Sequence, residues 1–152
     1  MTICNPDGIK LRIKKHQCLL GLDIGSKSIG IARSDTNLKI ATPALLIKRT
    51  KFTNDANDLV KIISEENAGA LVVGLPLEMN GKEGKQSQST RTFIDNFLKI
   101  KEIPVVFWDE RLSTKIVNRL MIEEADLSRR KRKKSIDKLA ATYILQGLLD
   151  YL

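Results

Sequence analysis

Short apolar runs separated by turn residues dominate the first third of the chain. Residues 19–24 form an apolar run that suits a buried strand, and Gly25 allows a tight turn after it. Residues 28–34 and 38–47 read as two further strands, joined near residues 35–37. The pattern predicts an antiparallel meander of three strands.

A helical period comes after the meander. Apolar residues between Ala56 and Ile63 recur with the spacing of one helix face, and Thr53 or Asn54 is placed to cap that helix. The helix should end near residues 67–69. Residues 70–74 then form a continuous apolar run, which is typical of a strand buried in a parallel sheet.

The remaining chain repeats this alternation. One helix should run to about Lys101, a fifth strand should cover residues 104–107, and Ser113 should cap another helix. The last helix should start near Ser135, since its apolar stripe from Ile136 onward fits the 3.6-residue period. The predicted fold class is therefore α/β, with a five-stranded mixed sheet. Three antiparallel strands come first, then two parallel strands reached by right-handed crossovers, with helices on the faces.

The hydrophobic residues among the first 18 positions show neither the helix nor the strand periodicity. We expect residues 1–18 to be a polar N-terminal extension outside the core, open to disorder, and residues 19–152 to form a single domain. A chain of 152 residues with 42% hydrophobic residues suits one packed core.

Several classes of protein are disfavoured by what the chain lacks. The apolar runs are too short to span a bilayer, and the N-terminus has no secretory signal pattern. Cys4 and Cys18 lack the count and spacing of a zinc site and are expected to be reduced thiols in a cytoplasmic protein. His16 is the single histidine, so catalysis through a histidine base is not expected.

Positive charge is the strongest compositional signal. The formal net charge is +8 at pH 7, and one block of consecutive basic residues carries much of it. A block of this density usually forms a solvated loop, and it also provides an electrostatic footprint for nucleic acid. No apolar helix face accompanies it, which favours nucleic acid over a membrane surface. Six residues make up the block: Arg129, Arg130, Lys131, Arg132, Lys133 and Lys134.

Three acidic residues lie where an α/β fold would bring them to one edge of the sheet. Asp23 lies in the first buried strand, where a lone carboxylate needs a partner or a metal. Glu110 comes after the fifth strand, although it and Asp109 also suit solvated charges that begin a loop. Asp137 lies in the first turn of the expected last helix, a place that the helix dipole alone explains.

Function is preferred because the three acids form a set. Carboxylates are suitable ligands for Mg²⁺ or Mn²⁺, and two such ions can activate water and stabilise the leaving oxygen of a phosphodiester. This chemistry needs neither a histidine nor a nucleophilic side chain. The interpretation is a nuclease with two Mg²⁺ or Mn²⁺ ions.

A loop between the fourth strand and the next helix is a second candidate element. Residues 74–84 are rich in turn residues and precede a helix, a place that suits phosphate binding by backbone N–H groups. An ordinary connecting loop explains them equally well. Lys82, Lys85 and Arg91 are candidates for phosphate contacts.

Four blocks of sequence, in order, resemble the YqgF/RuvX family, whose members are described as pre-16S rRNA nucleases and as Holliday junction resolvases. The resemblance extends from Leu19 to the C-terminus. Asp23, Glu110 and Asp137 each lie within one of the matching blocks. The blocks are Gly21 to Lys27, Val73 to Gly84, Asp109 to Thr114, and Asp137 to Gln146.

The resemblance implies an RNase H-like fold and metal-dependent hydrolysis of phosphodiesters, with the metal site at the three acids. Lys27 and Arg111 lie in the matching blocks and join the candidates for nucleic-acid binding. Members of the family often have Arg after the lysine of the first block, whereas this chain has Ser28. That departure puts a phosphate or packing contact in question.

The first block also resembles the phosphate-binding hairpin of sugar kinases and actin-like ATPases. Those folds need two such domains and more than twice this length, so ATP binding is disfavoured.

Three functions remain open. The first is 5′-end processing of precursor 16S rRNA, alone or within ribosomal precursor particles. The second is a resolvase acting on branched DNA, which should be a homodimer because it makes paired cuts. The third is a binding factor that acts on RNA or on the transcription machinery. Nothing in the sequence separates RNA from DNA, or a monomer from a homodimer.

Overall fold

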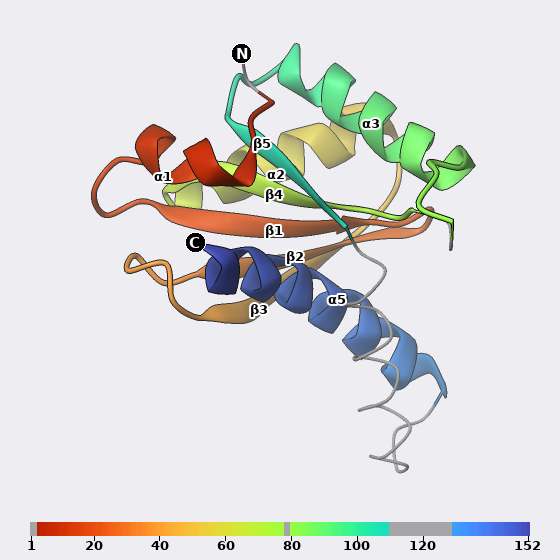
Figure 1. Cartoon of the computed structure of the whole chain (residues 1–152). Helices are drawn as coiled ribbons and strands as arrows, with labels where there is room; N and C mark the ends of the chain where they lie inside the picture. Colours follow the sequence, from red (N-terminus) through yellow and green to blue (C-terminus); the bar gives the residue numbers. More distant parts are fainter. Residues whose placement is uncertain (1–2, 78–79, 110–128) are drawn as a thin grey trace.

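The computed structural model describes the backbone of residues 3–77, 80–109 and 129–152, and the side chains of these residues except 129–138. In the described chain, five strands form one sheet with the order β3-β2-β1-β4-β5 (Figure 1). The strands are β1 (Cys18–Ile24), β2 (Ser28–Ser34), β3 (Ala41–Lys48), β4 (Ala68–Leu75) and β5 (Val105–Asp109).

The pairing confirms the predicted mixed sheet. β1 pairs antiparallel with β2, β2 antiparallel with β3, and both β1 and β5 pair parallel with β4. The three-residue link after β1 permits only a hairpin, whereas the parallel strands are reached through the helices α2 (Phe52–Glu65) and α3 (Lys85–Leu98). β3 begins later than expected because the Asp35 carboxylate closes the preceding turn, accepting hydrogen bonds from the backbone N–H groups of Lys39 and Ile40.

Large apolar side chains fill the face of the sheet that α2 and α3 cover. Alternate residues of β1, such as Leu20 and Leu22, belong to this cluster. They meet Leu59 of α2 and Phe97 of α3, all fully buried. The strand period of two and the helix period of 3.6 therefore produce one continuous core layer.

The opposite face of the sheet is covered by one long helix, α5 (Arg129–Tyr151) (Figure 1). Small residues let it lie close to the strands. A β-carbon added at Gly21 of β1 would lie 2.7 Å from Leu145 Cβ and 2.8 Å from the Ala141 carbonyl oxygen. Ala70 of β4 continues this layer of small residues, beside the larger Leu19 of β1.

Helix α5 begins six residues earlier than expected. The prediction of a loop for Arg129–Lys134 is wrong, because these residues form the first turns of the helix. Lys and Arg are good helix formers, so a solvated basic run extends a helix as readily as it forms a loop. No helix in the described parts of the chain is long and apolar enough to cross a membrane.

Residues 3–18 pack against the domain, so the prediction of an extension outside the core is wrong. The segment forms a short 3₁₀ turn, η1 (Pro6–Gly8), and a single helical turn, α1 (Ile9–Arg12). Ile9 is fully buried in the layer beneath α5, and the Cys4 backbone N–H donates to the Val105 carbonyl oxygen at 2.9 Å. Cys18 lies within β1, at 6% exposure. Only a few isolated residues anchor this segment. Its sequence therefore has no regular hydrophobic pattern that would predict the packing.

Candidate active site

The carboxyl ends of three parallel strands meet at one edge of the sheet. These are β1, β4 and β5, whose ends point to the same side of the molecule (Figure 1). Leu22 pairs with Val73 across β1 and β4, and one residue further along β4, Gly74 pairs with Trp108 of β5. Asp23 is therefore level with Gly74 and Trp108. Ligand sites in open α/β sheets lie at such an edge.

Asp23 lies on the α5 face of the sheet. Its neighbours Leu22 and Ile24 belong to the core under α2 and α3, and Gly21 meets α5, so strand alternation assigns Asp23 to the α5 side. Its side chain is half-buried, in contrast to the fully buried Leu22. Asp23 thus lies next to the last residue of the buried strand β1, as predicted, and its role in a site stays a prediction.

The turn after Asp23 is held by hydrogen bonds from two other elements. The Gly25 backbone N–H donates to the Ser28 carbonyl oxygen at 2.8 Å. Arg49 Nη1 donates to the Gly25 carbonyl oxygen at 2.6 Å. Gln86 Nε2 of α3 donates to the Ile24 carbonyl oxygen at 3.2 Å. The backbone beside Asp23 is thus fixed before any ligand binds.

Arg49 is itself fixed by α2 and α3. Its Nε lies 3.5 Å from Asp55 Oδ2, and its guanidinium carbon lies 5.3 Å from the centroid of the Phe93 ring. Asp55 is 1% exposed, and its Oδ1 accepts the backbone N–H of Thr50 at 3.1 Å. A buried carboxylate therefore holds Arg49 in the geometry that supports the turn.

Sequence reasoning missed Arg49, Asp55 and Gln86. A signal for Asp55 was present, since it belongs to the same buried face of α2 as Ala56, Leu59 and Ile62. A carboxylate on an apolar stripe indicates a buried ion pair. Lys51, and not Thr53 or Asn54, is the N-cap residue of α2, and it makes no side-chain capping bond.

The other two acids lie beyond the described side chains. Glu110 comes after the last described residue of β5 and lies outside the described residues. Position 137 lies in α5, one helical turn before Ala141, and its side chain is outside the described set. Among the described residues, no three acidic, cysteine or histidine side chains form a group that could hold a metal ion.

The predicted basic contacts divide into exposed and paired groups. Lys27, Lys82 and Lys85 are exposed. Arg91 is engaged within the protein, because its Nε lies 2.6 Å from Glu83 Oε1 and its guanidinium carbon lies 4.6 Å from the centroid of the Phe107 ring. The remaining basic candidates lie outside the described side chains: Arg111, Arg129, Arg130, Lys131, Arg132, Lys133 and Lys134.

The loop before α3 is partly closed by its own hydrogen bonds. Leu77 forms a bridge with Glu83, and Asn80 Oδ1 accepts the backbone N–H of Lys82 at 3.0 Å. Gly81 has a φ of 83°, which favours glycine. The Lys82 backbone N–H is therefore used within the turn of the loop itself, as in an ordinary connecting loop.

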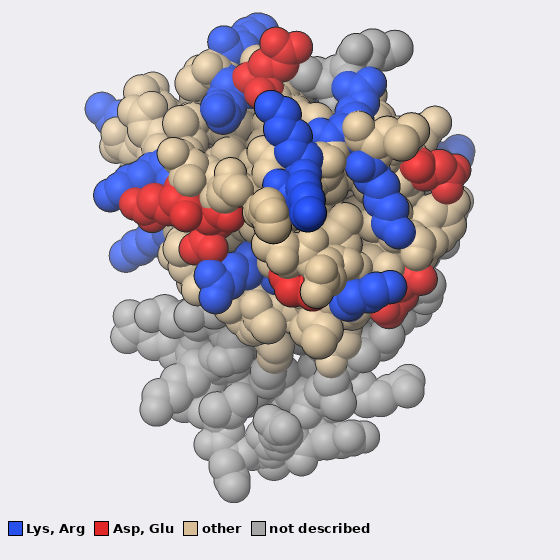
Figure 2. Space-filling model, turned by 90° about the vertical axis from the view of Figure 1, so that its left-hand side faces the viewer, with Lys and Arg blue, Asp and Glu red and all other residues tan. Residues whose placement is uncertain are grey.

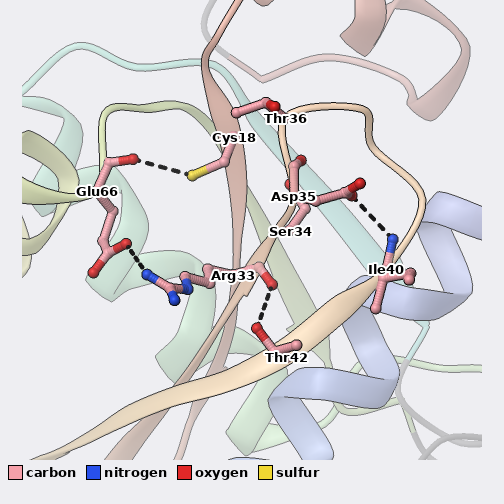
Figure 3. A pocket seen from close by; sticks show the side chains of 8 residues that line it. All are labelled: Cys18, Arg33, Ser34, Asp35, Thr36, Ile40, Thr42 and Glu66. Atoms are coloured by element: carbon pink, nitrogen blue, oxygen red, sulfur yellow. Dashed lines mark hydrogen bonds and ion pairs between the residues drawn. The ribbon is translucent and has the colours of Figure 1, made fainter.

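A cavity of about 400 Å³ lies at the amino end of β1, away from Asp23 (Figure 3). Its charged groups are already satisfied. Arg33 Nη1 lies 2.8 Å from Glu66 Oε2, and backbone N–H groups lower the pKa of Asp35, with that of Ile40 as the largest cause. The Cys18 thiol donates to the Glu66 carbonyl oxygen at 3.3 Å, and burial raises its pKa. These pairings make the cavity an unsuitable place for the predicted acid chemistry.

Comparison with known proteins matches almost the whole chain to one family. The family described as "RuvX: Holliday junction resolvase" matches residues 17–151. A protein of Paramagnetospirillum magneticum, named "Putative pre-16S rRNA nuclease", is 49% identical over 150 residues, which cover 99% of this chain and 96% of that protein. A protein of Rhodospirillum rubrum with the same name is 46% identical over 152 residues, covering 100% of this chain and 94% of its own length.

Solved structures share the fold at low identity. A Thermus thermophilus RuvC bound to a Holliday junction has a TM-score of 0.56 at 11% identity, covering 90% of this chain and 96% of that chain. A second T. thermophilus RuvC structure has a TM-score of 0.51 at 10% identity, covering 89% of this chain and 96% of that one. The likeness confirms the predicted RNase H-like fold.

Proposed function

Because the chain belongs to the RuvX family, we propose that it is a nuclease that hydrolyses phosphodiester bonds at the 5′ end of precursor 16S rRNA. The observation that carries the proposal is Asp23, a half-buried carboxylate at the carboxyl edge of the sheet with its turn fixed by Arg49. The near-full-length relatives named as pre-16S rRNA nucleases support the substrate class.

The proposed acid site consists of Asp23, Glu110 and Asp137. Val106 and Trp108 of β5 contribute to the layer under α5. Glu110 follows β5 in the sequence and enters the proposal through that position alone. β1 and β5 lie on either side of β4, so their backbones are about 10 Å apart. Gly74, level with Asp23 between them, carries no side chain to fill the gap.

The third acid is assigned to the same edge by the direction of α5. Gly21 lies between Ala141 and Leu145, and from there the amino-terminal part of α5 extends toward the side where β1 and β5 end (Figure 1). Position 137 is one turn, about 5 Å, from Ala141 in that direction.

The donor set fits a hard divalent cation. Three carboxylates and no histidine or thiolate favour Mg²⁺ or Mn²⁺, and two ions are the usual number for phosphodiester hydrolysis. Bound there, the metals would supply an activated water and charge stabilisation of the leaving oxygen. Asp23 would hold its place through the fixed turn, and the half-buried setting would strengthen its attraction for cations.

The exposed lysines would contact the substrate backbone. Lys27 comes after Asp23 on the β1–β2 turn, and Lys82 and Lys85 flank the start of α3, whose Gln86 supports that turn. Arg91 contributes little to such contacts because Glu83 already neutralises it. The basic turns of α5 and Arg111 complete the proposed phosphate contacts.

The decisive experiment is cleavage of two labelled substrates, a 16S rRNA precursor leader and a four-way DNA junction. Each is incubated with Mg²⁺ or Mn²⁺ and, separately, with EDTA, using wild type and Asp23→Asn. We expect metal-dependent cuts in the RNA leader by the wild type alone. Retained cleavage by a folded Asp23→Asn protein would contradict the acid site.

A resolvase is the second candidate function, favoured by the family's description as a Holliday junction resolvase. Paired, symmetrical cuts in the DNA junction, together with a dimer in sedimentation, would replace the rRNA substrate with branched DNA. Salt-sensitive binding without cleavage of either substrate would instead favour a binding factor.

A further inference from the structure

The N-terminal segment outside the family match carries an unassigned cluster of positive charge. Family likeness begins at residue 17, yet the P. magneticum relative aligns with 99% of this chain, which includes nearly all of the segment. Four of the residues 10–15 are basic, and the only acid in residues 3–18 is Asp7. We call the three lysines among them, Lys10, Lys14 and Lys15, the N-terminal basic surface.

The segment is anchored so that its lysines face solvent. Ile9 is fully buried beneath α5, while Lys10 and Leu11 are exposed, Leu11 at 92%, and Lys14 and Lys15 are exposed as well. The anchor and the exposed side chains alternate within a few residues. The backbone of the segment is therefore held on the domain while the three ammonium groups remain open to a ligand.

The neighbouring charges of the segment are engaged within the protein. The Asp7 carboxylate accepts a 2.7 Å hydrogen bond from the Tyr151 hydroxyl at the end of α5. Burial raises the pKa of the Cys4 thiol, and the nearby Arg12 guanidinium opposes that shift. Arg12 has an interaction within the protein and does not belong to the basic surface. No ion pair within the described part of the chain involves the three lysines.

The basic surface lies at the opposite edge of the sheet from Asp23. It precedes β1, on the side of the molecule shown in Figure 2, where blue Lys and Arg side chains are spread over the surface with red side chains between them. β1 spans seven residues, so about 20 Å separates the two edges. That distance corresponds to about six nucleotides along one strand of a duplex.

We propose that the N-terminal basic surface binds the phosphate backbone of the substrate nucleic acid at a distance from the cleavage site. This inference rests on the proposed nuclease function. Three exposed ammonium groups match a polyanion, and a site remote from the acids selects for substrate length and not for the scissile bond. Each contact releases counterions, so binding should depend steeply on salt.

The test compares the full chain with a variant carrying Lys10→Gln, Lys14→Gln and Lys15→Gln. A matched control, Lys61→Gln with Lys99→Glu, removes the same three units of net charge from exposed positions on α2 and next to α3. The ion pair of Lys61 with Glu65 is exposed and contributes little to stability. Fluorescence anisotropy in EDTA measures binding of single-stranded RNA of about 6 and about 30 nucleotides.

We expect the basic-surface variant to lose affinity for the long RNA alone. The slope of log affinity against log salt should become shallower by about 2, since each single-strand contact contributes about 0.7. The wild-type advantage should then shrink by on the order of 10- to 20-fold between about 50 and 200 mM salt. Equal slopes for the variant and the control on the long RNA would overturn the proposal.

Failure of this inference is distinguishable from failure of the proposed function. Binding in EDTA reports on the basic surface even when wild-type protein cleaves nothing. Conversely, normal Asp23-dependent cleavage with no slope change would remove the basic surface and leave the nuclease intact. Should the threefold variant not fold, Lys14→Gln with Lys15→Gln, both after α1, is expected to give about two thirds of the change in slope, and an unchanged slope again overturns the proposal.

Discussion

The two faces of the sheet differ in the size of their side chains and in the task that each face can take. The α2 and α3 face is filled by residues such as Leu22 and Phe97, each fully buried. The α5 face is lined by small residues, including Gly21 and Ala70, and its β1 row ends in a carboxylate, Asp23. The α2 and α3 face thus supplies most of the buried apolar volume. On the other face, the small side chains let α5 pack close to β1, near the end of the strand where Asp23 lies. Neighbouring residues of a single strand therefore carry separate tasks.

Asp23→Asn should have the largest effect, and it should lower cleavage without lowering stability. The amide keeps the shape but loses the negative charge that we assign to metal binding, so cleavage should fall by about 10³-fold or more. The melting temperature should change little, because the side chain is half-buried and contributes no core volume. Turnover of the RNA leader measures the loss of cleavage, and a thermal melt measures the melting temperature. A large drop in melting temperature would mean that Asp23 is structural.

Leu22→Ala, one residue earlier, should have the opposite effect. Removing a fully buried side chain leaves a cavity and should cost about 2–5 kcal/mol in the free energy of unfolding. Cleavage per folded molecule should stay near the wild-type value because the α5 face is unchanged. Urea denaturation measures the free energy of unfolding. Metal-dependent turnover, divided by the amount of folded protein, measures the cleavage per folded molecule. A variant of normal stability would contradict the assignment of Leu22 to the core.

Gly21→Ala should affect both properties. The new methyl group would lie 2.7 Å from Leu145 Cβ and 2.8 Å from the Ala141 carbonyl oxygen, so α5 must shift. We expect a loss of about 1–3 kcal/mol in stability and lower cleavage, since α5 carries position 137. Gly69→Ala is the control, because the atoms nearest its methyl group belong to the Gln17 side chain and not to α5. Equal effects from both alanines would argue against close packing of α5 as the cause.

Arg49→Lys should have the smallest effect. Lysine lacks the planar guanidinium that bonds the Gly25 carbonyl oxygen while lying against Asp55 and Phe93. We expect about 1 kcal/mol lower stability and a turnover reduced by less than about tenfold, with KM unchanged, because the turn loosens without losing substrate contacts. Steady-state kinetics separates the two constants. A raised KM with normal turnover would indicate that Arg49 contacts substrate instead.

Much of the fold could be predicted because each element has a complete local signal. The strands of the meander and the parallel pair show apolar runs bounded by turn residues, and all five strands occur in the structure. Boundaries failed where the signal was weak. Residues 3–16 are held by isolated anchors such as Ile9, and the basic residues that begin α5 carry no apolar stripe in the sequence.

The candidate site was predictable only in part. Asp23 stands out in sequence because a charge inside an apolar strand is costly. The support from Arg49 and Gln86 was not predictable, since it comes from segments that no local pattern connects. Asp55 could have been recognised as a buried charge on the apolar face of α2, but not as the partner of Arg49. Arg91 was assigned to phosphate from its charge, and only the structure pairs it with Glu83.

By itself the sequence determined which residues are strands, which face of each is apolar, and which acids stand at strand ends, because periodicity and desolvation act over a few neighbouring residues. Only the tertiary structure decided that Gly21 admits α5, that Asp55 holds Arg49 against the turn of Asp23, and that Ile9 anchors a basic segment at the far edge. Those relations depend on contacts between residues distant in the chain, and such contacts exist only once the sheet has brought its elements together.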